Sequence, residues 1–141
     1  MPFFYYLFYP IIKYERGDKM IKEIKTDNTL EITYLNGSEI VAFLSCIYHN
    51  AINELEITAL FATEEYGNSY YEDMLIDEAF LFAAEHDARV IKTYIGPEPY
   101  NPAPYRTKEV ELEWYKGYGF SEMSTVCGIT PCVMFDTAPF L

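Results

Sequence analysis

The feature that most constrains this fold is a strand, a short turn, an apolar helix and a second strand within residues 54–95. Residues 54–62, ELEITALFA, are apolar and β-branched enough to predict a strand. Apolar residues recur at helical spacing across 70–85, with acidic residues on the other side, so we expect a helix packed on a sheet there. The run VIKTYI at 90–95 predicts the second strand.

Two further strands precede this segment and form a hairpin. Residues 30–35 alternate as a half-buried strand does, and residues 39–47 form another apolar run. The pair Asn36-Gly37 lies between them, and a type I′ turn needs positive φ at both of its central residues. Three antiparallel strands therefore lead into the strand–helix–strand segment.

The C-terminal third begins with a proline-rich stretch. Residues 96–105 contain four prolines, which remove backbone donors and fix φ, so this stretch is a long loop. A helix capped by Thr107 follows and ends at Gly117 or Gly119. Two final strands complete the sheet, at about 121–127 and 131–136. We predict an α+β fold with a mixed, mostly antiparallel sheet of six or seven strands and two main helices.

The chain is strongly acidic, with 22 Asp and Glu against 10 Lys and Arg and a net charge of −12. No Lys or Arg occurs between Thr26 and Ala88, whereas Asp and Glu occur thirteen times there. A field of this sign favours cations, so we expect a cationic small molecule or a basic protein as partner. It also disfavours direct nucleic-acid binding, because phosphates would be repelled.

The N-terminal run at 3–12, FFYYLFYPII, is intensely aromatic. It is far shorter than the roughly 20 residues of a membrane span, and it lacks the features of a signal peptide, so we expect no membrane insertion. We predict an aromatic arm at 1–19 and a single domain at 20–141. Two interpretations of the arm stay open: an extra strand or arm that covers the core, or a patch that forms a homodimer.

The cysteines and histidines point away from disulfides and metals. Three cysteines are too few for a disulfide framework and suit a reducing, cytoplasmic compartment. Cys127 and Cys132 do not have a zinc spacing, and His49 and His86 are isolated from any ligand-like pattern. We therefore predict no metal site.

The segment 54–95 and the helix ending at Trp114–Phe120, WYKGYGF, together resemble the GNAT acetyltransferase superfamily. Members of that family close the corresponding helix with a sequence like YEKLGF. The resemblance covers about residues 22–136. It implies acetyl-CoA as cofactor, bound between two strands that splay apart, with its pyrophosphate at the start of the following helix. It also implies cofactor contacts from Phe61, Ala62, Thr63, Asn68, Ser69, Tyr70 and Tyr71.

The phosphate loop departs from the family pattern. That pattern reads R-x-x-G-x-G/A, and the aligned residues 67–72 are GNSYYE. Glycine lets the main chain approach phosphates closely, but the two glycine positions hold Tyr70 and Glu72. The tyrosine adds bulk, and the Glu72 carboxylate competes for the helix amides and repels the ligand's charge. We therefore do not expect tight CoA binding.

The resemblance also suggests catalytic residues. Tyr115 matches the tyrosine that protonates the departing thiolate, and Glu56 matches a position that often carries the base. Alternation places Glu54 and Glu56 on one face of their strand, where a carboxylate pair can receive an amine. Two alternatives stay open: Tyr115 packs beside Trp114 under the sheet, and the two glutamates face solvent. The asparagine that the family places seven residues before the tyrosine is Lys108 here.

Two functions follow from these features. The first is a weak or atypical acetyl-CoA-dependent N-acetyltransferase that acts on a cationic amine. The second is a catalytically inactive acidic module that engages a basic protein, as a mimic of nucleic-acid charge. Binding of acetyl-CoA separates the two.

Overall fold

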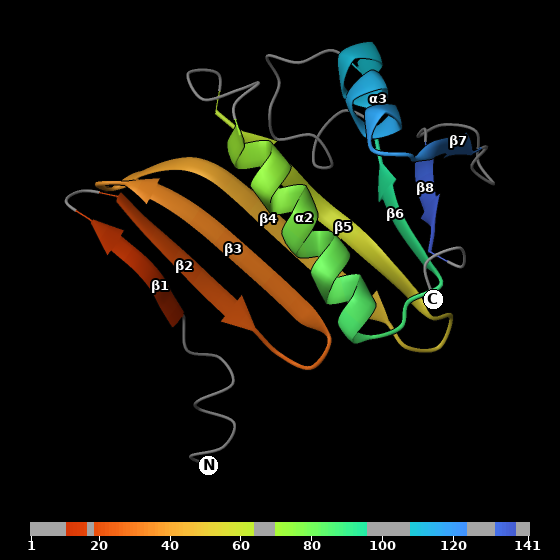
Figure 1. Cartoon of the computed structure of the whole chain (residues 1–141), viewed down its shortest axis with the longest axis horizontal. Coiled ribbons are helices and arrows are strands. Elements are labelled where there is room, and N and C mark those ends of the chain that lie inside the picture. Colours follow the sequence, from red (N-terminus) through yellow and green to blue (C-terminus); the bar gives the residue numbers. More distant parts are fainter. Residues whose placement is uncertain (1–10, 17–18, 64–69, 96–107, 124–131, 138–141) are drawn as a thin grey trace.

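The computed structural model describes residues 11–16, 19–63, 70–95, 108–123 and 132–137. In this part of the chain, helices α2 (Tyr70–Glu85) and α3 (Lys108–Gly117) accompany one sheet (Figure 1). The sheet contains eight strands: β1 (Ile11–Arg16), β2 (Lys19–Lys25), β3 (Thr29–Asn36), β4 (Glu39–His49), β5 (Glu54–Ala62), β6 (Val90–Tyr94), β7 (Ser121–Met123) and β8 (Cys132–Asp136).

The strand order is β1-β2-β3-β4-β5-β6-β8-β7. Neighbouring strands are antiparallel throughout, except that β5 and β6 are parallel. Parallel neighbours need a crossover connection, and α2 supplies it between β5 and β6. The mixed, mostly antiparallel α+β architecture with two helices is confirmed.

The hairpin between β3 and β4 forms where the sequence predicts it. Its two loop residues are Gly37 and Ser38, because Asn36 is the last residue of β3 and pairs with Glu39. Gly37 has a φ of 64°, a left-handed conformation that costs glycine little, whereas Asn36 lacks the positive φ that a type I′ turn over Asn36-Gly37 needs. The strand predicted at 54–62 and the helix predicted at 70–85 coincide with β5 and α2. These elements are strongly periodic, and their pattern is the strongest signal that a sequence offers.

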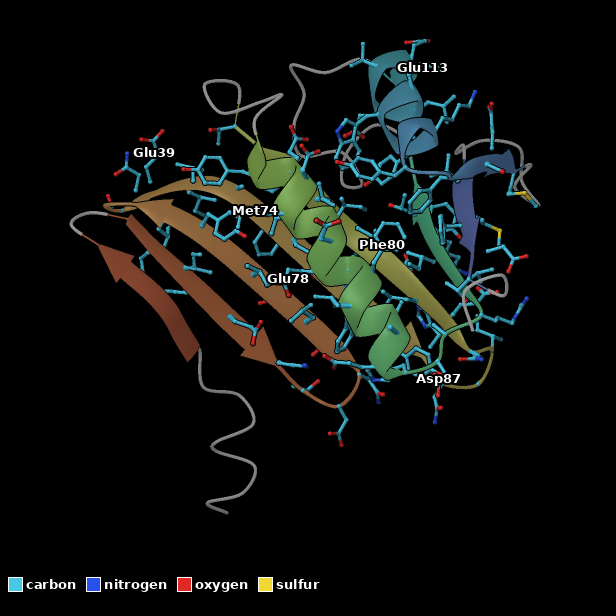
Figure 2. All side chains as sticks on the ribbon, in the orientation of Figure 1. Glu39, Met74, Glu78, Phe80, Asp87 and Glu113 are labelled. Atoms are coloured by element: carbon cyan, nitrogen blue, oxygen red, sulfur yellow. The ribbon has the colours of Figure 1, made fainter. Side chains whose placement is uncertain are left out.

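The core lies between the sheet and α2. Side chains of α2 pack on β4 and β5. The largest fully buried apolar side chains of the described helices and strands are Phe82, Leu44, Leu55, Ile57, Leu75, Ile76, Ile91, Ile95 and Val133. On α2, Phe80 extends toward the side of β6 (Figure 2), where its ring centroid lies 4.9 Å from that of Phe135 on β8. Each fully buried aliphatic or aromatic side chain contributes about 1.5–3 kcal/mol relative to exposure. The helix-facing side of the sheet therefore carries the stability of the fold.

The N-terminal part of the sheet extends beyond the prediction. β1 pairs with β2, and β2 pairs with β3, which gives one strand more than the predicted maximum of seven. The boundary predicted between an arm at 1–19 and a domain at 20–141 falls at the first residue of β2. Residues 11–16 of the predicted arm are a sheet strand, and residues 1–10 lie outside the described part. No described helix is long and apolar enough to cross a membrane.

Candidate functional site

The candidate site begins where β5 and β6 part. Their parallel pairing runs from Glu54 opposite Val90 to Ile57 opposite Thr93, whereas β5 continues to Ala62. The two ribbons diverge toward the start of α2 (Figure 1). A bulge accompanies the end of the pairing, because the β4–β5 register skips Thr58. Thr93 Oγ1 donates a hydrogen bond of 2.9 Å to the carbonyl oxygen of Ile57 and so closes the last paired position.

Tyr115 on α3 lies against this parting point. Its side chain is 3% exposed and is hydrogen-bonded to Thr93. Its ring packs edge-on against Trp114 and Phe120, with centroid distances of 4.9 and 5.1 Å. Burial, followed by the charge of Glu111, raises the pKa of the Tyr115 phenol well above its usual range. The hydroxyl is therefore protonated at neutral pH, buried under the sheet and held where the two strands separate.

The first turn of α2 holds two carboxylates beside this phenol. Glu72 is 1% exposed. Burial and the hydrogen bond to Asp73 raise the pKa of Tyr118, and the charge of Glu72 adds to the raised pKa of both Tyr118 and Tyr115. Tyr118 donates its hydroxyl hydrogen bond to Asp73, which links the end of α3 to the start of α2. A helix N-terminus attracts anions, and here protein carboxylates already supply the negative charge. These two carboxylates therefore disfavour the pyrophosphate of CoA at this helix start.

The predicted cofactor contacts are spread over several environments. Ala62 is fully buried on the side of α2, whereas Phe61 lies on the other side of the sheet with its ring centroid 5.9 Å from that of Phe43. The Thr63 amide donates to the carbonyl of Val41 at 3.0 Å. Its hydroxyl is buried with no hydrogen-bond partner among the described residues.

The remaining predicted contacts lie around the start of α2. Tyr71 packs its ring 5.5 Å from that of Tyr34, so this tyrosine belongs to the interface between helix and sheet. Tyr70 is the first helical residue. Asn68 and Ser69 lie outside the described residues.

Glu54 and Glu56 lie on the sheet face opposite α2, because Leu55 and Ile57 between and beyond them point into the helix-facing core. Each carboxylate already has cationic or imidazole partners. Glu54 bonds Arg89 Nη2 at 2.8 Å and Lys92 Nζ at 3.0 Å. Burial alone would lower the pKa of Lys92, but the bond to Glu54 and nearby negative charges raise it overall.

The Glu56 side chain is more exposed than that of Glu54. Its Oε1 lies 2.8 Å from His49 Nε2, and the side chain of Glu56 is 18% exposed. Tyr115 lies on the other face of the sheet, at the neighbouring paired position formed by Ile57 and Thr93. The Glu56 carboxylate on one face and the protonated Tyr115 phenol on the other therefore lie on either side of the point where β5 and β6 separate.

Sequence reasoning missed Thr93, His49 and Lys92 as members of this arrangement. The turn at 50–53 brings His49 opposite Glu54, so hairpin pairing offered a signal for the histidine. Nothing local marks Thr93, whose position depends on the parallel register of β5 and β6. Within the described ranges, no group of three or more His, Cys, Asp or Glu side chains can hold a metal ion.

Comparison with known structures identifies the fold. No protein-family model matches the sequence, and no curated protein sequence matches it. Among solved structures, the chain is similar to the PaiA N-acetyltransferase of Thermoplasma acidophilum, solved in complex with coenzyme A. That match has a TM-score of 0.61 and 17% identity and covers 77% of this chain and 61% of the other.

Two further structures give the same result. The GNAT domain of S. lividans PAT matches with a TM-score of 0.61 and 13% identity, over 77% of this chain and 61% of that one. A GNAT-family acetyltransferase from Staphylococcus aureus matches with a TM-score of 0.56 and 13% identity, over 77% and 68%. The match thus spans about three fifths to two thirds of the length of these proteins. At such identities the likeness concerns the fold.

Proposed function

We propose, from the GNAT fold that this chain has, that it is an N-acetyltransferase of weak or atypical activity that acts on a cationic amine. One observation carries the proposal: the pairing of β5 and β6 ends at Ile57 and Thr93, and the Tyr115 hydroxyl is held there in its protonated form. A protonated phenol at the parting of two strands suits the delivery of a proton to a leaving thiolate.

The residues on the sheet face opposite α2 suit an amine as the acceptor of the acetyl group. Glu56, bonded to His49, can take a proton from an ammonium group that approaches along this face. The acidic surface raises the local concentration of cations. Acetyl-CoA would supply the acyl group as a thioester, with Ala62, Thr63 and the start of α2 as its nearest contacts. The carboxylates of the first turn weaken the hold on its phosphates.

Calorimetry with acetyl-CoA tests the proposal, using the wild-type chain, Glu72→Gln and a control, Asp77→Asn, which removes an exposed charge one turn further along α2. Loss of the Glu72 charge should raise the affinity on the order of tenfold, since it lies in the first helical turn. The control should not. No heat at millimolar acetyl-CoA with either the wild type or Glu72→Gln would overturn the transferase proposal.

A rate measurement completes this test. Thiol release from acetyl-CoA would be followed with a diamine and with a lysine-rich peptide as acceptors. Glu56→Gln and Tyr115→Phe should each lower the rate, while Glu31→Gln, an exposed carboxylate on the same face as Glu56, should leave it unchanged. Equal rates for all four proteins would remove Glu56 and Tyr115 from the mechanism.

A second candidate function is an acidic binding module for a basic protein. The buried Glu72 carboxylate in the first turn of α2 favours this candidate. Its charge opposes coenzyme A, with which the structurally similar PaiA N-acetyltransferase was solved. Micromolar binding of acetyl-CoA by the wild-type chain would exclude this candidate. Its positive signature would be salt-sensitive binding of a polylysine probe without any acetyl transfer.

A further inference from the structure

The sheet face opposite α2, hereafter the open face, carries an apolar patch on three neighbouring strands. Its members are Leu35 on β3, Ile40, Phe43 and Ile47 on β4, and Phe61 on β5. They alternate with Tyr34, Ala42, Leu44, Cys46 and Leu60, all buried on the helix side. The strand register places these side chains on the same face, since Leu35 lies opposite Ile40 and Phe43 lies opposite Phe61.

Parts of this patch remain exposed. Ile40 is 44% exposed and Ile47 is 37% exposed, although each lies in a long central strand. The described helix α2 packs on the other side of the sheet, and Tyr115 of α3 is buried in that same core. Apolar side chains gathered on a sheet face that the described helices leave open mark a place where another segment packs.

The start of β1 lies within reach of the patch. β1 is the edge strand, and its first residue, Ile11, pairs with Glu23 of β2. The register continues through Ile32 of β3 to Leu44 of β4, so the chain enters the sheet level with Phe43. Strands are about 4.8 Å apart, which puts β4 about 14 Å and β5 about 19 Å from β1. An extended chain covers these distances in about four and six residues.

The residues before β1 match the patch in length and chemistry. Residues 3–9, FFYYLFY, are all aromatic apart from one leucine. Pro10 follows them directly and has no N–H for a strand ladder, which favours a change of direction before β1. We propose that residues 3–9 pack across the open face of their own sheet, over β3, β4 and β5.

The covalent connection favours the same chain over a second copy. A segment joined directly to β1 has an effective concentration in the millimolar range at the patch. A second molecule at micromolar concentration competes poorly with it. The aromatic arm then shields an apolar face, and a homodimer through the arm becomes the competing outcome of the test.

The test compares the full chain with a variant that lacks residues 2–10. The deletion ends there because removing residues 1–19 would also remove β1. Isoleucine δ1-methyl NMR signals report on the open face, where Ile40 and Ile47 should shift when the aromatic rings are lost. Ile52 is the control, since it is 47% exposed but lies in the β4–β5 turn. Sedimentation equilibrium of both proteins gives the oligomeric state.

The proposal expects both proteins to be monomers, with shifts at Ile40 and Ile47, none at Ile52, and no dependence on protein concentration. Unchanged signals at Ile40 and Ile47 would overturn it. Shifts that vary with concentration, together with a full-chain dimer that the deletion dissociates, would assign the arm to a second copy and overturn it as well. If the deletion does not fold, the triple substitution Phe4→Ser, Leu7→Ser and Phe8→Ser provides the same comparison.

Discussion

The two faces of β5 carry different kinds of side chain. On the helix side, Leu55 and Ile57 are 0% and 2% exposed and belong to the main core. On the open face, Glu54 and Glu56 bond a lysine, an arginine and a histidine. The four successive positions 54–57 thus serve two different purposes. Packing secures the fold on one side, and ionisable groups gather on the other.

This division separates the residues that hold the fold together from those at the start of α2. The buried contacts that hold β5, β6 and α2 together come from apolar side chains along these elements. Tyr70 and Glu72, at the glycine positions of the GNAT pattern that the sequence resembles, lie in the first turn of α2. Side chains such as Glu72 therefore set the chemistry of the helix start, whereas the apolar side chains set the layered architecture.

The largest test of this contrast compares neighbouring residues on opposite faces. Leu55→Ala should cost about 2–5 kcal/mol of unfolding free energy, because it empties a fully buried site. Glu56→Gln should cost less than about 1 kcal/mol, since its partner His49 is 38% exposed and can bind water instead. Urea unfolding followed by circular dichroism measures both. Similar losses for the two variants would contradict the division of labour between the faces.

The second test asks whether the open face has a structural anchor of its own. Glu54 is 7% exposed and bonds Arg89 and Lys92, so Glu54→Gln leaves two cations without their carboxylate. We expect a loss of about 1–3 kcal/mol in urea unfolding. Glu31→Gln on the same face should stay within about 0.5 kcal/mol of the wild type. A loss at Glu54 no larger than at Glu31 would make this face energetically neutral.

Much of the fold was predictable because its central elements are periodic. The bounds predicted for β5 and α2 match, and a hairpin joins β3 and β4 as predicted, although its loop is Gly37-Ser38 rather than Asn36-Gly37. β2 was missed for a physical reason. Its residue Glu23 is 6% exposed, on the side that faces the helix, so the strand does not alternate between apolar and polar residues.

The site was less predictable than the fold. Glu56 and Tyr115 were identified by resemblance, and their roles remain predictions. Their partners depend on long-range pairing: Thr93 meets Ile57 only through the parallel register, and Lys92 reaches Glu54 across the same pair of strands. Sequence patterns report periodicity within an element, whereas these contacts depend on how separate elements align.

The smallest effect concerns the Tyr115 hydroxyl, which lies in the core at the point where β5 and β6 separate. Tyr115→Phe should cost about 0.5–1.5 kcal/mol at pH 7, the net value of one hydrogen bond. Burial first, and then Glu111, raise the folded-state pKa above the unfolded value of 10.0. The neutral phenol therefore stabilises the protein fully below pH 10, and this contribution is lost as the pH rises further. Tyr115→Phe should flatten the alkaline decline in stability. Tyrosinate absorbance at pH 11 should be equal in the folded wild type and in Tyr115→Phe. A lower signal in the variant would show that Tyr115 ionises like an exposed tyrosine in the folded protein. Tyr115 would then not belong to the buried side of β5.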